Sequence, residues 1–427
     1  MPTINHGSAI GGSASSLRST TSYTGAVYNL NERYEKKLDE RFRSKSYTDA
    51  GANLNGFNWV GVNAIQVETS GVGRVNAYDF GAALGSRMGT MHEISDQLNT
   101  YQLKQFYSIR ETYEKLYSDD KLNERKIQRI LKDINDEVLV PAIDKYRLKT
   151  WADGAGTTGV ITSSGLVVNT SSVTAAAMTT SNLVKALLTA NAMLDNMRVP
   201  QEGRMAYIGF TDAITMQLAD ELKYQVDFTK QGAVNGEIRK LGRTSVVAVP
   251  DSYMPAGAKV IFKWKKASVD PRKLSWSHVY PNVEGYSGPV LNGLYRYDSF
   301  VLAQKANGIF VLGDSNAFPQ ATPTMAKGTS GDDGKVVITS NGGSTNASHI
   351  YYTIDGHNPK IKDNGSSVVL GGSATSGVLK ITNPSADCYI QAYAISSGKV
   401  ASGIAKYFFK ASDGTVTALS YSEEVPI

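Results

Sequence analysis

Cysteine is almost absent from this sequence, because Cys388 is the single one in 427 residues. One thiol excludes an intrachain disulfide framework and a cysteine-based zinc site. Long hydrophobic runs are missing too: no stretch approaches the roughly 18 to 20 apolar residues of a membrane span. The N-terminal twenty residues, MPTINHGSAIGGSASSLRST, contain no apolar run of the signal-peptide kind. We therefore expect a chain made in the cytoplasm, outside membranes, and held together by packing alone.

A strong excess of charge is also missing, since the formal net charge is +5 and the pI is near 8.9. Without a dense run of lysine or arginine, sequence-specific nucleic-acid binding is not expected, although loose contact with a polyanion stays open. The hydrophobic content of 41% is enough for a sizeable core, and the length favours more than one domain.

Arginine is absent from the C-terminal part of the chain. All 16 arginines lie at or before Arg296, whereas eight lysines follow residue 313. This change in composition indicates two modules. Residues 314–333 are rich in Pro, Thr, Ser and Gly, so we expect a linker there. Residues 1–27 are rich in Gly, Ser and Thr and predict an arm that gains order only against another surface.

The pattern between residues 30 and 112 predicts a helix, two strands and a long loop. The charged segment 30–44 is a helix candidate, and from Phe57 the apolar period changes to two. The loop 71–97 between the strands is too long for a hairpin turn, and long loops are usually functional or used between chains. The residues expected on strand faces are Ile65, Val67 and Thr69, then Tyr101, Leu103, Tyr107 and Ile109.

A helix is expected from residue 119 to about 153, with Pro141 inside it. Ser118 and the acidic residues after it provide an N-cap. Proline removes a backbone donor and costs about 3 kcal/mol inside a regular helix. Two interpretations stay open: a boundary between two shorter helices, or one long helix kinked at the proline. The apolar stripe comprises Ile127, Ile130, Leu131, Ile134, Val138, Ile143, Tyr146 and Leu148.

The remaining part of the first module mixes helices and strands without regular βαβ alternation, which indicates the α+β class. Helices are expected at 182–197 and 213–222. Strands are expected at 204–210, 244–250 and 259–264, and as a pair, SFVLAQK and IFVL, joined across Ala306-Asn307-Gly308.

This order of segments resembles the major capsid protein of tailed bacteriophages, whose Hong Kong 97-like fold is also called the Johnson fold. The resemblance covers roughly residues 28 to 313. It is carried by VPAIDKYRLKTWADGAG (140–156), RMAYIGFTDAITMQL (204–218) and YRYDSFVLAQKANGIFVL (295–312). It implies an N-terminal arm (1–56), an extended β-hairpin loop (57–112), and a long spine helix within the peripheral and axial domains (113–313). It also favours the kinked helix over the boundary at Pro141.

The same resemblance implies a function and partners. Pentamers and hexamers would form an icosahedral shell around the double-stranded DNA of a tailed phage, with arms and loops overlapping neighbouring copies. A separate scaffolding protein, a portal, and minor capsid or decoration proteins would be partners, and contact with packaged DNA would be non-specific. The subunit would lie in the virion after assembly in the bacterial host cytoplasm. Some relatives join subunits covalently through a lysine of the extended loop. No lysine lies between Lys45 and Lys104, so such cross-links are not expected. Neither a fused coiled-coil leader nor a cleaved prosegment is expected.

Residues 334–427 resemble the chitobiase-type, Ig-like C-terminal β-sandwich. The segments that carry this are GKVVITSNGG, HIYYTIDGHNPK and YIQAYAISSGKVASGIAKYFF. Asp355-Gly356 is a tight-turn signal after an alternating aromatic strand. On a capsid such a domain would point outward as a decoration.

Residue types that carry chemistry do not form a pattern typical of an enzyme or a cofactor site. The five histidines have no metal-ligand spacing, and Asp355 fits a turn better than a glycosidase carboxylate, which needs a second carboxylate nearby. Tyr280, Tyr286, Tyr295 and Tyr297 favour core or interface packing over ligand binding. The run Lys263, Lys265, Lys266, Arg272 and Lys273 could face DNA, solvent or another subunit.

We therefore expect a structural protein without catalytic residues, metal or cofactor. Two alternatives are the shell protein of an encapsulin-like bacterial nanocompartment and, more distantly, a carbohydrate-active enzyme with paired carboxylates in residues 57–313.

Overall fold

The computed structural model divides the chain into two compact units, residues 1–43 and 44–427. All described residues belong to the second unit, so the predicted arm (1–27) and the predicted helix 30–44 lie outside them. The described ranges are 46–60, 63–70, 78–81, 83, 86–88, 96–112, 134–168, 175–219, 233–234, 237–238, 240–241, 243–280, 283–285, 290–315, 318–340, 346–361 and 369–419.

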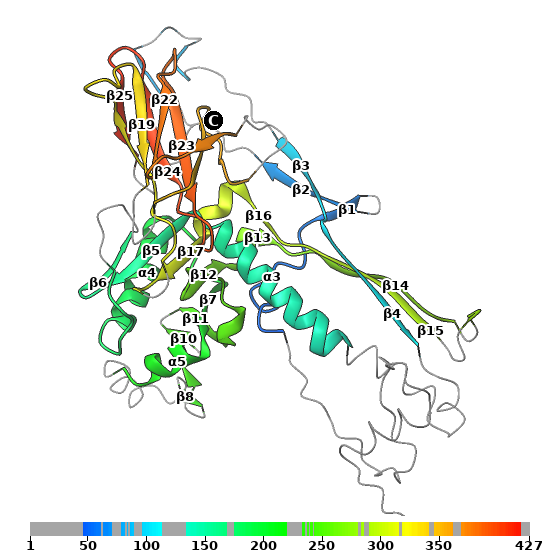
Figure 1. Ribbon diagram of the computed structural model, residues 1–427. Helices are drawn as coiled ribbons and strands as arrows, with labels where there is room; N and C mark the ends of the chain where they lie inside the picture. Colours follow the sequence, from blue (N-terminus) through cyan, green and yellow to red (C-terminus); the bar gives the residue numbers. More distant parts are fainter. Residues whose placement is uncertain are drawn as a thin grey trace, which may run out of the picture. The chain divides into compact units, whose positions relative to one another are not determined.

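A seven-stranded mixed sheet is the centre of the first module (Figure 1). Its order is β10-β11-β7-β12-β17-β5-β6. The pairs β7–β11 and β5–β17 are parallel, and the other pairs are antiparallel. The strands are β5 (Thr157–Thr162), β6 (Gly165–Val168), β7 (Arg204–Gly209), β10 (Lys240–Leu241), β11 (Thr244–Val249), β12 (Val260–Trp264) and β17 (Ile309–Gly313).

Both faces of this sheet are covered, which explains why β17 is apolar throughout. Phe310 and Leu312 pack in one core with α4 (Leu183–Asn196) and α5 (Phe210–Gln217), whereas Ile309 and Val311 pack in a second core with α3 (Val140–Asp153). The predicted helix 182–197 is confirmed, and so are the strands at 204–210, 244–250 and 259–264. The predicted helix 213–222 begins earlier, at Phe210, directly after β7.

The chain stays helical through Pro141. A π-helical turn, η2 (Asn135–Leu139), precedes α3, and the Val140 N–H donates to the Asn135 carbonyl, five residues back. The wider turn accommodates a residue that has no N–H and whose ring would clash with the carbonyl four residues earlier. A boundary between two helices at Pro141 is therefore wrong. The stretch 113–133 of the predicted spine lies outside the described residues.

The π-turn also changes which side chains face the core. Val138 was expected in the apolar stripe, but 59% of it is exposed, whereas Leu139 is only 5% exposed. A π-turn holds more residues than an α-turn, so the position that returns to the core after Ile134 moves from 138 to 139. Leu139 packs with Ile143 and the partly buried Ile134.

Two smaller sheets extend from this module. One contains β1 (Asn58–Val60), β2 (Ala64–Ser70) and β3 (Asp96–Gln102), and β2 and β3 are the strands expected on either side of the loop 71–97. The other is a long ribbon of β14 (Arg272–Tyr280), β15 (Val290–Tyr297) and β4 (Gln105–Thr112) (Figure 1).

The alternation from Tyr101 to Ile109 predicted one strand, but the chain divides there into β3 and β4. Leu103 N–H still donates to the Asn63 carbonyl at 2.8 Å, in register with the β2–β3 ladder. The break follows at the next residue, because Lys104 N–H donates to the side chain of Asp298, with 2.7 Å to Oδ2.

The predicted hairpin across Ala306-Asn307-Gly308 is wrong. Residues Ala303–Gly308 form a 3₁₀-helix, η5, and the flanking strands belong to different sheets: β16 (Phe300–Val301) pairs with β13 (Ser268–Val269), and β17 joins the central sheet. Leu302 N–H bonds to the Ala267 carbonyl at 3.0 Å, which directs the chain away from a hairpin. The remaining short elements are η3 (Asp251–Tyr253), η4 (Lys265–Ala267), β8 (Ala233–Val234) and β9 (Glu237–Ile238).

The C-terminal residues form a β-sandwich of two antiparallel sheets around one core. Ile338 contributes from one sheet, and Ile350, Ile390 and Phe409 contribute from the other. The sheets are β18-β19-β22 and β21-β20-β23-β24-β25. The strands are β18 (Thr324–Lys327), β19 (Lys335–Thr339), β20 (His349–Thr353), β21 (Leu370–Ser373), β22 (Val378–Thr382), β23 (Cys388–Ile395), β24 (Ala405–Lys410) and β25 (Thr415–Ala418).

The segment expected as a linker, 314–333, is packed over much of its length. It contributes β18 to the sandwich, and Gln320 and Ala321 are fully buried. Gln320 Nε2 donates to Ser340 Oγ at 3.0 Å, and Ser340 Oγ donates to the Ala321 carbonyl at 2.6 Å.

Candidate assembly surfaces

The first described segment, 46–53, is fastened to α3 by a buried carboxylate. Asp144, 1% exposed, accepts hydrogen bonds from Ser46 Oγ at 2.7 Å, Tyr47 N–H at 2.8 Å and Thr48 Oγ1 at 2.6 Å. A carboxylate in the interior is tolerated when donors surround it in this way. The segment that begins at Ser46 is therefore fixed on α3.

An arginine on the same face of α3 holds the next residue of the segment. Arg147 Nη1 lies 2.6 Å from Asp49 Oδ1, and Arg272 approaches the other oxygen at 3.4 Å. Burial raises the pKa of Asp49, but the hydrogen bond and charge of Arg147, with the charge of Arg272, lower it further, so the net pKa is below its ordinary value. At Gly51 a Cβ would lie 2.1 Å from the Tyr207 hydroxyl, so only glycine fits where the segment 46–53 passes Tyr207.

A second buried carboxylate, Asp270, gathers donors from four segments. These are Asn53 N–H at 3.0 Å, Trp151 Nε1 at 3.0 Å, and the hydroxyls of Ser268 and Ser299, each at 2.6 Å. Asp270 therefore connects the segment 46–53 with α3 and with the strand pair β13–β16.

Lys263 lies beside Asp270, and its side chain is fully buried. The prediction that it belongs to a charged run facing DNA, solvent or another subunit is therefore wrong. Its Nζ donates to the Gly51 carbonyl at 2.6 Å, lies 4.0 Å from Asp270 Oδ2, and is 4.2 Å from the centre of the Trp151 ring. Burial lowers the pKa of Lys263 to about 8, against the opposing charge of Asp270.

The other members of the run do not form one charged face. Arg272 pairs with Asp49, and Lys273 lies over the Trp59 ring at 5.3 Å, whereas Lys265 and Lys266 are exposed. The sequence run is therefore divided among a core, an ion pair and the surface.

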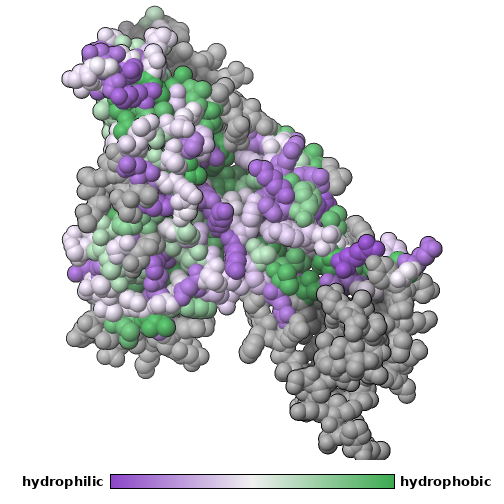
Figure 2. All heavy atoms as spheres, viewed as in Figure 1, coloured by the Kyte–Doolittle hydropathy of each residue, from purple (hydrophilic) through white to green (hydrophobic). Residues whose placement is uncertain are grey.

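An apolar stripe on α5 faces outward. Phe210, Ile214 and Leu218 recur every four residues on one side of the helix and are 44%, 57% and 57% exposed. Figure 2 shows the corresponding apolar area over α5. The Tyr47 ring continues this surface through edge contacts with Phe210 at 6.1 Å and Tyr253 at 6.2 Å. Contiguous exposed apolar side chains of this kind mark an interaction surface.

A second set of exposed apolar side chains lies in the predicted loop and on the ribbon. Phe80 and Met88, in the described parts of the loop 71–97, are 80% and 79% exposed. Phe106 and Tyr107 on β4 are also exposed. Exposure of these apolar side chains to water is unfavourable, so they mark a surface that another surface covers.

The four tyrosines singled out in the sequence do not come together as a ligand site. Tyr295 and Tyr297 are buried against α3 in one core cluster, which agrees with the packing interpretation. Tyr280 is exposed, and Tyr286 lies outside the described residues. Burial and the hydrogen bond to Asp298 raise the pKa of the neighbouring Tyr146 to about 12.

His349, His357 and Asp355 lie in ordinary structural positions, whereas His6 and His92 lie outside the described residues. Asp355 Oδ1 accepts the His357 N–H at 3.1 Å in the turn after β20, where Gly356 has a φ of 79°, so the predicted turn is confirmed. His349 stacks on Tyr351. Within the described ranges, no group of three or more His, Cys, Asp or Glu is arranged to hold a metal ion.

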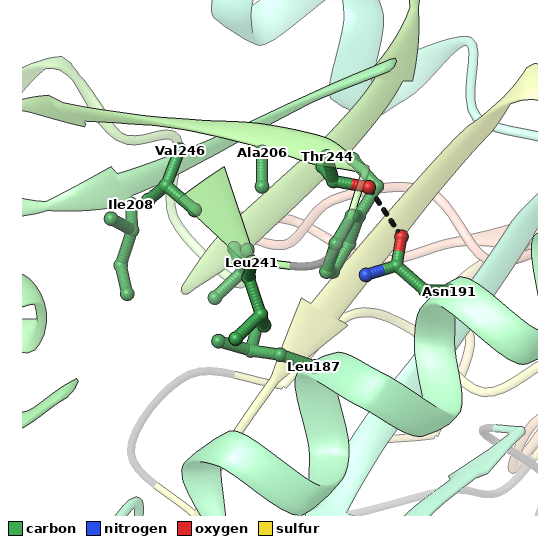
Figure 3. A pocket seen from close by; sticks show the side chains of 9 residues that line it. Leu187, Asn191, Ala206, Ile208, Leu241, Thr244 and Val246 are labelled. Carbon is green, nitrogen blue, oxygen red and sulfur yellow. Dashed lines mark hydrogen bonds between the residues drawn. The ribbon is translucent and has the colours of Figure 1, made fainter. Parts of the chain in front are cut away.

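A narrow pocket among the described residues lies between α4 and the central sheet, and Figure 3 shows the side chains that line it. It has no room for a water molecule, and Thr244 Oγ1 donates to Asn191 Oδ1 at 2.6 Å across it. An open groove of about 670 Å³ lies between the α5 N-terminus and the sandwich turn at Lys399. Its carboxylates are engaged: Asp251 accepts from Thr211, and Asp212 pairs with Lys259 at 3.4 Å.

A bilayer-spanning helix, long and apolar enough for that purpose, is not found in the part of the chain that the structure describes.

Asp144 and Arg147 hold the segment 46–49, and we call these two residues and that segment the clasp. They were not singled out from the sequence, although the sequence contains a signal for them. Asp144 and Arg147 fall on the same helical face as Val140, Leu148 and Trp151, all buried. A charged pair inside an apolar stripe requires partners, and the polar run Ser-Tyr-Thr-Asp at 46–49 supplies them.

No family model matches the sequence, and no curated protein matches it. Among solved structures, the chain is similar to the capsid of cyanophage P-SCSP1u, with a TM-score of 0.53 and 15% identity, over 67% of this chain and 94% of that chain. Mycobacterium phage Che8 gives a TM-score of 0.48 and 14% identity over 67% and 98%. The capsid of Ralstonia phage GP4 gives 0.47 and 10% over 69% and 98%. The match to the cyanophage capsid shows that the 67% of this chain that it covers has the fold of a phage capsid protein.

Proposed function

We propose that this chain is a structural, non-enzymatic subunit of a tailed-bacteriophage capsid. The observation that carries the proposal is the structural match to the cyanophage capsid. The match covers 94% of the cyanophage capsid chain and leaves part of this chain outside it. Sequence identity of 15% supports a shared fold and leaves function to be argued from the surfaces.

The exposed apolar side chains support assembly with other copies. The α5 stripe, the loop residues Phe80 and Met88, and the β4 residues Phe106 and Tyr107 lie on separate elements. Each buried Å² of apolar surface contributes about 25 cal/mol, so several such contacts per subunit stabilise a closed shell. We propose pentamers and hexamers as the building units of an icosahedral shell.

The proposed surroundings follow from that role. The shell encloses double-stranded DNA with non-specific contacts, is assembled in the bacterial host cytoplasm with a separate scaffolding protein and a portal, and becomes part of the virion. Residues 1–56 are the arm, 57–112 the extended loop, and 113–313 the peripheral and axial domains with the spine helix. The sandwich of residues 334–427, together with β18 from the segment 314–333, is an outward Ig-like decoration.

The test is assembly of the full chain, expressed alone and together with a candidate scaffolding protein from the same genome. We expect particles of uniform diameter by electron microscopy and a fast-sedimenting peak in a sucrose gradient. A chain that stays monomeric with and without the scaffold would overturn the proposal. Particles that enclose enzyme cargo and exclude DNA would instead identify the nanocompartment alternative.

A further inference from the structure

Two short 3₁₀-helices that are distant in the sequence, η4 and η5, lie against each other. Gly308, at the end of η5, is packed on η4, because a Cβ there would lie 3.2 Å from the Ala267 Cβ and 3.4 Å from the Trp264 Cβ. The Ala267 carbonyl accepts the Leu302 N–H at 3.0 Å, which fixes the position where η5 begins. The two helices therefore form one continuous surface.

Three lysines stand together on this surface, and we call Lys265, Lys266 and Lys305 the lysine patch. All three are exposed. The Lys305 Nζ lies 5.9 Å from the centre of the Trp264 ring, and the indole N–H donates to the Glu202 carbonyl at 3.1 Å. Burial lowers the pKa of Lys305, and the charge of Lys266 lowers it further, so these two amines are close enough to repel each other.

The lysine patch lacks a neutralising carboxylate among the residues that the structure describes. Within those residues, no Asp or Glu side chain forms an ion pair with any of the three amines, and this includes the exposed Glu202. Lysines elsewhere on the surface do have such partners, since the Lys380 amine lies 2.7 Å from Asp332 Oδ2. The patch therefore concentrates positive charge that the subunit itself does not compensate.

We propose that the lysine patch is a contact surface for the phosphates of double-stranded DNA, bound without preference for sequence. The inference rests on the proposed function, in which the shell encloses DNA, and it adds which face of the subunit is turned toward that DNA. Lysine is a point charge on a flexible stem, so it pairs with a phosphate without a fixed geometry. Phosphate contacts carry no sequence information.

The grouping of the charges favours a polyanion over an acidic protein surface. Duplex DNA carries one phosphate charge per about 1.7 Å of its axis, so a few neighbouring phosphates match a cluster of three amines. Lysines that replace the condensed counterions release them, which favours binding at low salt. Protein ion pairs in this chain instead match single charges, as Arg147 matches Asp49 at 2.6 Å.

The first test measures binding of the unassembled full chain to a fluorescent duplex of about 20 base pairs, by anisotropy at several salt concentrations. Each neutralised phosphate contributes about 0.9 to the slope of log K against log salt. We expect the slope of the triple variant Lys265→Gln, Lys266→Gln, Lys305→Gln to be shallower than the wild-type slope by about 2.7. Arginine at the same three positions keeps the charge and should keep the wild-type slope.

The matched control removes the same charge where it is already paired. Lys335, Lys380 and Lys410 lie 3.4, 2.7 and 3.7 Å from aspartate oxygens, and glutamine at all three should leave the slope unchanged. Equal slopes for the patch variant and this control overturn the proposal, because binding then follows net charge alone. Should the triple patch variant fail to fold, Lys305→Gln alone is expected to reduce the slope by about 0.9.

The second test asks whether the patch meets DNA inside assembled particles. Lysines are acetylated with a small reagent in DNA-filled and in empty particles, and the modified residues are identified by mass spectrometry. We expect less acetylation of the lysine patch in filled particles and no difference at Lys380. Equal acetylation of the patch in both kinds of particle overturns the contact. Failure of the proposed function looks different, because then no particles form at all.

Other partners of the lysine patch leave different results. Binding to phosphatidylglycerol vesicles without binding to the duplex would assign the patch to a membrane surface. Loss of assembly in the triple glutamine variant with an unchanged DNA slope would assign it to a contact between subunits. Either result overturns the proposal.

Discussion

Asp144 is a buried carboxylate whose three donors come from a segment almost a hundred residues earlier in the chain. Replacing it with alanine leaves the Ser46 and Thr48 hydroxyls and the Tyr47 N–H without their acceptor. We expect Asp144→Ala to lower the free energy of unfolding by about 3 to 5 kcal/mol, measured by urea unfolding.

The matched control for this change is the exposed Asp333. Asp333→Ala is expected to change stability by no more than about 0.5 kcal/mol. Equal, small effects of both substitutions would show that the clasp does not stabilise the fold.

Lys263 gives a pH prediction at the same scale. Its folded pKa is about 8, below the value of about 10.4 in an unfolded chain. The unfolded state therefore binds more protons between these values, so stability rises with pH there. We expect Lys263→Met to flatten the rise by about 1.4 kcal/mol per pH unit, compared by urea unfolding at about pH 8 and about pH 9.5.

The exposed Lys266 is the control, and Lys266→Met should leave the pH dependence of stability unchanged. If Lys263→Met has the same slope as the wild type, the buried lysine keeps its ordinary pKa.

The sequence alone did not reveal that Lys263 is buried, because Lys263 stands beside Lys265 and Lys266 in what is read as one charged run. β12 lies in the middle of the sheet, and its pleat directs Lys263 into the interior.

The α5 stripe leads to a prediction at the scale of the element. Ile214 is 57% exposed, so an aspartate there is solvated in the monomer and costs it little. In a subunit contact the same carboxylate loses its water without gaining a partner. We expect Ile214→Asp to keep the wild-type unfolding midpoint and to reduce the assembled fraction at least about tenfold, measured by sedimentation.

Gln217 on the same helix is exposed and serves as the control, since Gln217→Asp adds the same charge next to the stripe. Normal particle yield from Ile214→Asp would exclude the α5 stripe as an assembly contact.

Elements with a strong local signal could be predicted, and elements decided by distant contacts could not. The helix 182–197 has six buried apolar residues at helical spacing, and α4 occupies 183–196. The hairpin at 306–308 failed because the Ala267 carbonyl, far away in sequence, captures Leu302 N–H. A second distant contact acts on η5, because the Gly156 N–H donates to the Ala306 carbonyl. Together these two hydrogen bonds outweigh the local turn preference of Asn-Gly.

At the scale of the whole molecule, the sandwich is joined to the central sheet by a packed junction. Val400, between β23 and β24, is 2% exposed and packs in the same cluster as Val311. The Gly403 N–H donates to Thr158 Oγ1 at 3.0 Å, and the Ile404 N–H donates to the Gly156 carbonyl at 2.8 Å. We therefore expect the sandwich and the central sheet to unfold together.

All four tryptophans, Trp59, Trp151, Trp264 and Trp276, lie outside the sandwich, so their fluorescence reports on the first module. Phe409 is fully buried in the sandwich core. We expect Phe409→Ala to remove about 3 to 5 kcal/mol and to shift the tryptophan transition by the same amount as the circular dichroism transition.

Thr417 on β25 is exposed, so Thr417→Ala is the control and should move neither transition. A tryptophan transition that is unchanged in Phe409→Ala would mean that the two modules unfold independently. The change in arginine content predicts two modules. Composition carries no information about how firmly they join, because that depends on Val400, Gly403 and Ile404 meeting β5.

The π-turn before Pro141 has a consequence for comparing related sequences. In a regular α-helix of 3.6 residues per turn, Ile134 and Ile143 would point to opposite sides, yet both contact one core cluster. The turn absorbs one residue and restores the phase. Relatives without a proline here are therefore expected to be one amino acid shorter between the two isoleucine positions, and an alignment that forbids this gap will pair inward-facing positions with outward-facing ones.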